Sequence, residues 1–131
     1  MLQESPKDPI RPPVISPRSR AEAHRAIETE IRREKAEALG RAGERLEDAL
    51  SALEGTRVAI GGIEARLRDG TGSAEEAALF QESREKLSAR LPLLRDQAYR
   101  AYQYLIIQRE AVGLRSHLDV ERRYHVAERL G

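Results

Sequence analysis

Apolar residues recur at alternating steps of three and four through the middle of this chain. The positions are Leu39, Ala42, Leu46, Ala49, Leu53, Thr56, Ile60, Ile63 and Leu67. A heptad pattern sustained over about four heptads places these side chains on one face of a long α-helix. Ile27 and Ile31 extend the stripe one position out of phase, and Ser19 is a candidate N-cap. We therefore expect one helix over about 19–69, with a break or small hairpin at Gly61-Gly62 as the alternative.

A cluster of turn-forming residues at 69–73 ends this helix, and Ser73 with Glu76 forms a capping box that starts another. A second apolar seam then occupies about 73–113. Its members are Phe80, Leu87, Leu91, Leu94, Ala98, Ala101, Leu105 and Val112. Reflection about the turn pairs Leu53 with Leu91 and Leu39 with Leu105. The sequence predicts an all-α fold, a long antiparallel two-helix coiled-coil hairpin over 19–131.

The ends of the chain differ from this pattern. Near Gly113 the apolar phase changes, which predicts a break followed by a short helix over about 119–130. Residues 1–18 hold five of the six prolines, so we expect a disordered, partly polyproline-like tail. Within it, Ile10, Pro12, Pro13 and Val14 form a candidate docking motif for a partner protein. The alternative is a leader without a role.

The most informative candidate site lies on the second helix. At 100° per residue, Tyr99, Tyr102 and Ile106 lie about 60–120° from the Leu94–Leu105 face, and Arg95 and Arg109 edge them. We call these five residues the Tyr/Ile strip. Aromatic and arginine side chains are typical of interface cores, and a two-helix hairpin leaves such a strip uncovered. We expect a second copy to cover it in a four-helix bundle, with a dimer as the first expectation; the C-terminal segment or a different protein are the alternatives.

Several function classes have no support in the sequence. The formal charge is +1 and there is no cysteine, so we expect no thiolate metal site and no strong attraction to nucleic acid or membranes. No phosphate-binding loop or nucleophile motif occurs. His117, Glu121 and His125 stand at i, i+4 and i+8, a face that we expect to be solvated. No cofactor or metal is expected, and no transmembrane or secretory segment is visible, so cytoplasmic localisation is the default expectation.

The pattern as a whole predicts a non-enzymatic protein–protein interaction module: an adaptor, scaffold or assembly factor. It would self-associate through the hairpin and bind partners by the Tyr/Ile strip and the Pro-rich tail. The alternative is a helical bundle that binds a small ligand or metal between hairpins. Nucleic-acid binding through arginine-rich helix faces is a third possibility, which the near-neutral charge disfavours.

Overall fold

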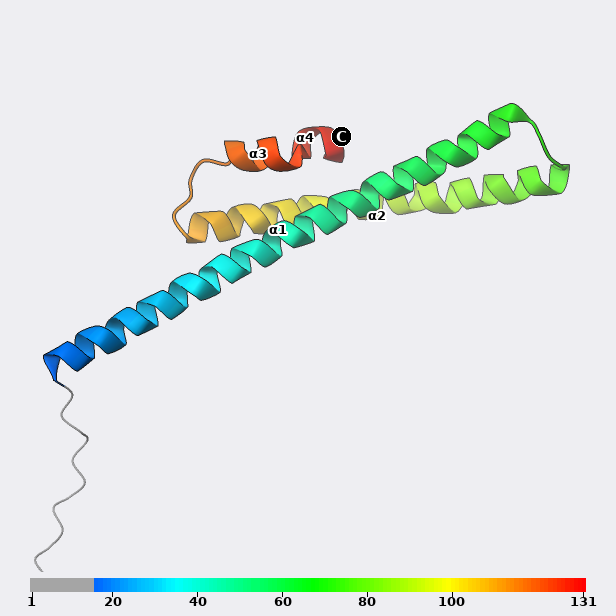
Figure 1. Ribbon diagram of the computed structural model, residues 1–131. Coiled ribbons are helices and arrows are strands. Elements are labelled where there is room, and N and C mark those ends of the chain that lie inside the picture. Colours follow the sequence, from blue (N-terminus) through cyan, green and yellow to red (C-terminus); the bar gives the residue numbers. More distant parts are fainter. Residues whose placement is uncertain (1–15) are drawn as a thin grey trace, which may run out of the picture. The chain divides into compact units, whose positions relative to one another are not determined.

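The computed structural model describes residues 16–131, and this part of the chain is helical with no strand. Its elements are α1 (Pro17–Asp69), α2 (Ala74–Ala111), α3 (Leu118–Tyr124) and α4 (Val126–Leu130). The two long helices pack against each other as an antiparallel hairpin, and α3 and α4 lie beside it (Figure 1). The predicted all-α helical hairpin is confirmed.

Helix α1 begins two residues before the predicted start. Ser16, not Ser19, acts as its cap: the Ser16 Oγ accepts a hydrogen bond of 3.1 Å from the Ser19 backbone N–H. Pro17 then occupies the first helical position, where its missing N–H costs nothing. The helix continues without a break through Gly61-Gly62, because the apolar seam keeps its phase across this pair.

The chain divides into two compact units, with the boundary between residues 34 and 35. In the first unit, every residue from 16 to 34 is exposed. Local pairs link its side chains along the helix, among them Arg18 with Glu22 at 3.4 Å and Arg33 with Glu30 at 2.7 Å. Pairs of this kind add a few tenths of a kcal/mol each, about 0.2–0.5. This part of α1 therefore depends on helix propensity and local pairs.

The second unit, residues 35–131, contains the hydrophobic core. Side chains from both long helices meet there with Val120 of α3 and Val126 of α4, which are 3% and 2% exposed. The other buried members are Ala42, Leu46, Leu50, Ala98, Ala101 and Leu105. Along the hairpin, the Arg66 guanidinium lies over the Phe80 ring at 5.5 Å, which joins the two helices near their turn.

The segment after α2 turns back along the hairpin. Helix α2 ends at Ala111, and Gly113 takes a φ of 89°, a left-handed conformation that glycine adopts without strain. The sequence predicted one helix over about 119–130, but the structure has two, separated by His125 at φ 50°. On one continuous helix, Val120 and Val126 would point about 120° apart. The break at His125 allows both side chains to enter the same core.

This core predicts the effect of shortening its side chains. Leu50 is fully buried, so Leu50→Ala should lower the free energy of unfolding by about 2–5 kcal/mol through lost burial and an unfilled cavity. Leu93 is 66% exposed, and Leu93→Ala should change it by less than about 0.5 kcal/mol. Chemical denaturation followed by circular dichroism measures both. Equal losses in the two variants would contradict the assignment of the core.

Candidate partner-binding surface

The C-terminal segment, residues 114–131, covers one half of the Tyr/Ile strip. The Tyr102 hydroxyl donates a hydrogen bond of 2.8 Å to Glu121 Oε1. Tyr102 and, one turn further along α2, Ile106 are half-buried. Burial and the neighbouring Glu121 carboxylate raise the pKa of Tyr102 to about 12, because both disfavour the phenolate. This half of the strip therefore contacts the chain's own C-terminal segment.

Arg109, at the edge of the strip, holds the start of the C-terminal segment. Its Nη2 donates to both carboxylate oxygens of Asp119, at 2.8 and 3.0 Å, and to the Ser116 carbonyl at 3.0 Å. The Arg109 side chain is only 11% exposed. Desolvation alone would raise the pKa of Asp119, but the hydrogen bond and positive charge of Arg109, with backbone hydrogen bonds, outweigh it and lower that pKa. Asp119 thus stays ionised at neutral pH.

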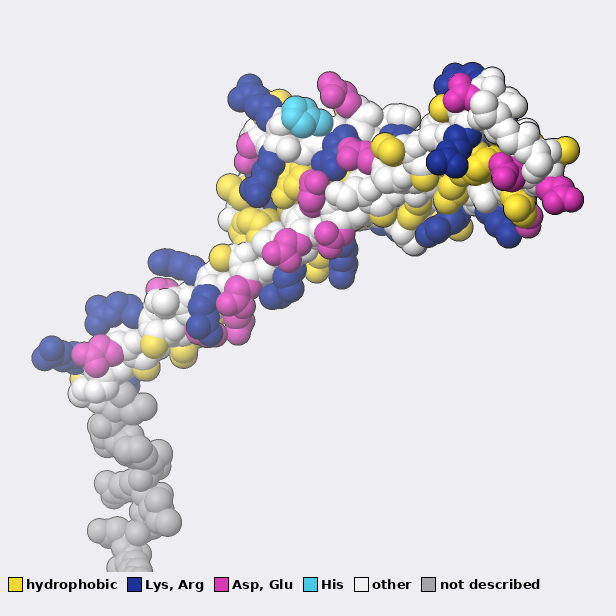
Figure 2. Space-filling model, turned by 45° about the vertical axis from the view of Figure 1, so that its right-hand side comes forward, with side chains coloured by type: hydrophobic (Ala, Val, Ile, Leu, Met, Phe, Trp, Pro, Cys, Tyr) yellow, Lys and Arg dark blue, Asp and Glu magenta, His cyan; other side chains and the backbone are white. Residues whose placement is uncertain are grey.

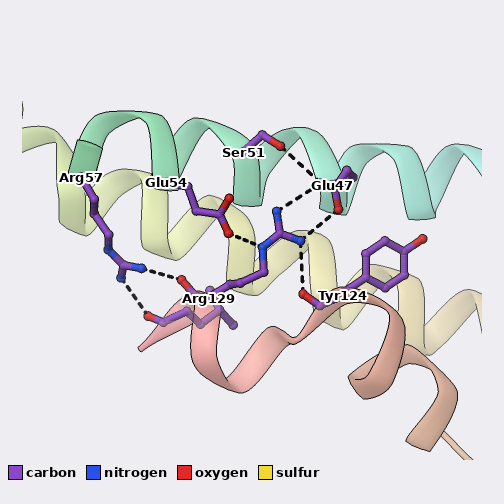
Figure 3. Close-up of polar contacts among 7 residues, drawn as sticks. Glu47, Ser51, Glu54, Arg57, Tyr124 and Arg129 are labelled. Carbon is purple, nitrogen blue, oxygen red and sulfur yellow. Dashed lines mark hydrogen bonds and ion pairs between the residues drawn. The ribbon is translucent and has the colours of Figure 1, made fainter. Parts of the chain in front are cut away.

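A second set of contacts fastens the far end of the segment to α1 (Figure 3). Arg129 reaches between Glu47 and Glu54: its Nη1 and Nη2 donate to the two Glu47 carboxylate oxygens at 3.0 and 3.1 Å, and its Nε donates to Glu54. We call these three residues the Arg129 clasp. The hydrogen bonds from Arg129 lower the pKa of Glu47, and those to Glu47 and Glu54 raise the pKa of Arg129. Glu47 and Arg129 are therefore both charged at neutral pH.

Two further α1 residues support the clasp. The Arg57 guanidinium donates to the Arg129 carbonyl at 2.7 Å and to the Gly131 carbonyl at 3.2 Å. These carbonyls belong to the last turn of α4, where no intrahelical partner remains. Gly43 provides room for α3, since a Cβ there would lie 2.7 Å from the Tyr124 hydroxyl. Sequence reasoning missed these contacts, and their only local signal is that Glu47, Glu54 and Arg57 lie near one another on one face of a helix.

The other half of the Tyr/Ile strip is open. Tyr99 is 50% exposed and Arg95 is also exposed. Both line a hollow of about 430 Å³ with Pro92, Asp96 and Leu130. The structure thus brings Tyr102 and Arg109 against the C-terminal segment, keeps Ile106 half-buried, and leaves Arg95 and Tyr99 at the open end.

A larger groove of about 940 Å³ runs beside α3. Small residues of α1, Gly40 and Gly43, form one wall, and Arg123 and Tyr124 of α3 form another. The Glu44 and Glu47 carboxylates and the Arg109 guanidinium also line it. The groove therefore carries charges of both signs, and neither sign dominates it.

The remaining candidate positions do not form a metal site in the part that the structure describes. No group of three potential ligands occurs among residues 16–131. His117 Nε2 lies 3.3 Å from Glu110, Glu121 is bonded to Tyr102, and His125 interrupts the helix. The three positions 117, 121 and 125 consequently do not share one continuous helix face. The candidate motif of Ile10, Pro12, Pro13 and Val14 lies outside the described residues.

No helix between residues 16 and 131 is both long enough and apolar enough to span a membrane. Comparison of the chain with protein-family models, with curated proteins and with solved structures gives no match.

Removal of the Arg129 charge should release the C-terminal segment. Arg129→Met keeps most of the side-chain volume but leaves Glu47 and Glu54 without their cation. Because both carboxylates are about half exposed, we expect a loss of about 1 kcal/mol in stability. Hydrogen exchange should show faster exchange across α3 and α4. Arg122→Met is the matched control, because Arg122 is exposed on the same segment. Unchanged protection of α4 in Arg129→Met would show that the clasp does not hold the segment.

Alkaline titration should report the covered half of the strip. The pKa of Tyr102 is raised from 10.0 to about 12, so the folded state holds this proton longer than the unfolded chain. The stabilising contribution of Tyr102 is complete below pH 10 and is lost as the pH rises toward 12. Absorbance of tyrosinate should show one late component that disappears in Tyr102→Phe and moves to lower pH in Glu121→Gln. A late component that persists in Tyr102→Phe would contradict this assignment.

Proposed function

We propose that this chain is a non-enzymatic protein–protein interaction module of the adaptor, scaffold or assembly-factor kind. The observation that supports it best is the open end of the Tyr/Ile strip, where Tyr99 is half exposed beside Arg95 and a hollow of about 430 Å³. An exposed aromatic side chain next to arginine, with a recess beside it, is the arrangement that binding hot spots use. A partner that fills the recess would remove Tyr99 from water.

The distribution of apolar side chains supports the same function. The large hydrophobic residues that stay exposed include Val58 at 74%, Leu79 at 64% and Leu93 at 66%. All three lie in the part of the two long helices, residues 58–93, that contributes no residue to the buried cluster. Exposed apolar side chains in such numbers on a small chain favour a surface that another protein covers.

We also propose self-association, with a homodimer as the first form to test. The C-terminal segment occupies the place over Tyr102 that a second copy was expected to take. A second copy would therefore contact the open end at Tyr99. The Pro-rich motif of Ile10, Pro12, Pro13 and Val14 is proposed as a further contact for partner proteins, because such segments bind in a preformed extended conformation.

A single substitution at the open end tests the proposal. Tyr99→Glu introduces a charge at an exposed helix position, so the variant should keep its helicity while dimer dissociation becomes at least about tenfold easier. Light scattering behind a sizing column measures the mass over a range of concentrations. Tyr102→Glu is unsuitable because it would place a second carboxylate beside Glu121.

Tyr104→Glu is the matched control, since Tyr104 is a 40% exposed tyrosine on the opposite side of α2. Its mass should equal that of the unmodified chain. If the unmodified chain stays monomeric at all concentrations, the proposed self-association is wrong. If the chain associates and Tyr99→Glu leaves its mass unchanged, the open end is not the contact between copies.

A further inference from the structure

Helix α2 carries a second line of side chains on the face away from the C-terminal segment. We call it the outer stripe, and it steps by four and three through Leu93, Gln97, Arg100, Tyr104, Ile107 and Ala111. Every one of these residues is exposed; Leu93, Tyr104 and Ile107 are 66%, 40% and 60% exposed. Alternating steps of four and three are the spacing by which one helix packs along another. The outer stripe therefore has the spacing of a helix-packing seam but no helix over it in residues 16–131.

Helix α1 contributes a parallel line to the same face. The Arg45 guanidinium lies 5.2 Å from the centre of the Tyr104 ring, which shows that these two residues share one side of the hairpin. From Arg45 the exposed positions Arg41, Asp48 and Ala52 continue with the same steps. Glu47, which binds the C-terminal segment, is two residues from Arg45 and so points about 160° away. The hairpin thus has one face covered by α3 and α4 and one face that they leave open.

The open face is basic, although the whole chain carries a formal charge of only +1. Arg41, Arg45, Arg90 and Arg100 lie on or beside it. Its carboxylates are Asp48 and, at the edge, Asp96, which pairs with Arg100 at 3.1 Å. Figure 2 shows one side of the molecule, on which hydrophobic side chains of the hairpin stay exposed among charged side chains of both signs. Apolar positions flanked by more arginines than carboxylates favour a partner with apolar and acidic side chains.

We propose that the outer stripe binds an acidic amphipathic helix of a partner protein. The stripe spacing matches a helix, the exposed Leu93, Tyr104 and Ile107 would receive its apolar side chains, and the arginines would pair with its carboxylates. A second copy of this chain fits less well, because two-fold pairing of the face with itself would bring arginines against arginines. This inference deepens the proposed function, since it rests on the chain being a protein-binding module and adds the class of partner.

The probe is a synthetic amphipathic peptide of about four heptads, with leucine at its core positions and glutamate at the flanking ones. Its repelling carboxylates keep it from pairing with itself. A sequence-matched peptide with lysine in place of glutamate is the charge control. Fluorescence anisotropy against the full chain should show binding of the acidic peptide that weakens with salt, and binding of the lysine peptide at least about tenfold weaker.

Two protein variants locate the binding face. Ile107→Glu should weaken binding of the acidic peptide at least about fivefold, because it removes an apolar contact and adds a like charge. Ile27→Glu makes the same change at a 59% exposed isoleucine outside the stripe, and binding should stay within about twofold. Circular dichroism should show that both variants remain helical.

Each outcome decides the question. Equal affinity for the two peptides, or equal weakening by Ile107→Glu and Ile27→Glu, would overturn the inference. A reduced solution mass of Ile107→Glu would instead show that a second copy occupies the face, which also overturns it. Failure of the peptide assay together with a dimer that depends on Tyr99 would reject the outer stripe alone and leave the proposed function standing.

Discussion

The docking of the C-terminal segment depends mainly on the burial of Val120 and Val126 against the hairpin. A hairpin of two helices can bury only one stripe of each helix. The two valines add to the core around Leu46, Leu50 and Leu105 from outside the two long helices. Burying a valine side chain contributes about 1.5–3 kcal/mol. A partly exposed ion pair such as that of Arg129 with Glu47 contributes about 0–1 kcal/mol. Apolar burial thus provides most of the attachment, and the arginines determine where the segment lies.

The hairpin could be predicted because its signal is local and periodic. Leu46, Leu53, Ala98 and Leu105 were placed on the seams by spacing alone, and all four are buried. Ser73 was recognised as a cap from its own short motif, and its Oγ accepts from the Glu76 backbone N–H. Each of these features involves residues within a few turns of one another, so one sequence is sufficient to detect them.

The return of the C-terminal segment could not be predicted in the same way. Arg129 and Glu47 are separated by 82 positions, and no periodic pattern links residues so far apart. Val120 and Val126 share a core only because His125 takes a left-handed conformation, which breaks the helical phase that the sequence pattern assumes. Tyr102 of the predicted Tyr/Ile strip lies against the C-terminal segment and Tyr99 stays exposed, a difference within the strip that became visible only in the structure.

The covered and open faces of the hairpin differ in how far their arginines are paired with acceptor groups. Where α3 and α4 dock, three arginines have carboxylate or carbonyl partners: Arg109 binds Asp119, Arg129 binds Glu47 and Glu54, and Arg57 binds main-chain oxygens. On the open face, Arg41, Arg45, Arg90 and Arg100 outnumber the carboxylates, and the apolar side chains of the outer stripe stay in water. An acidic partner would therefore gain more from binding to the open face than a basic one.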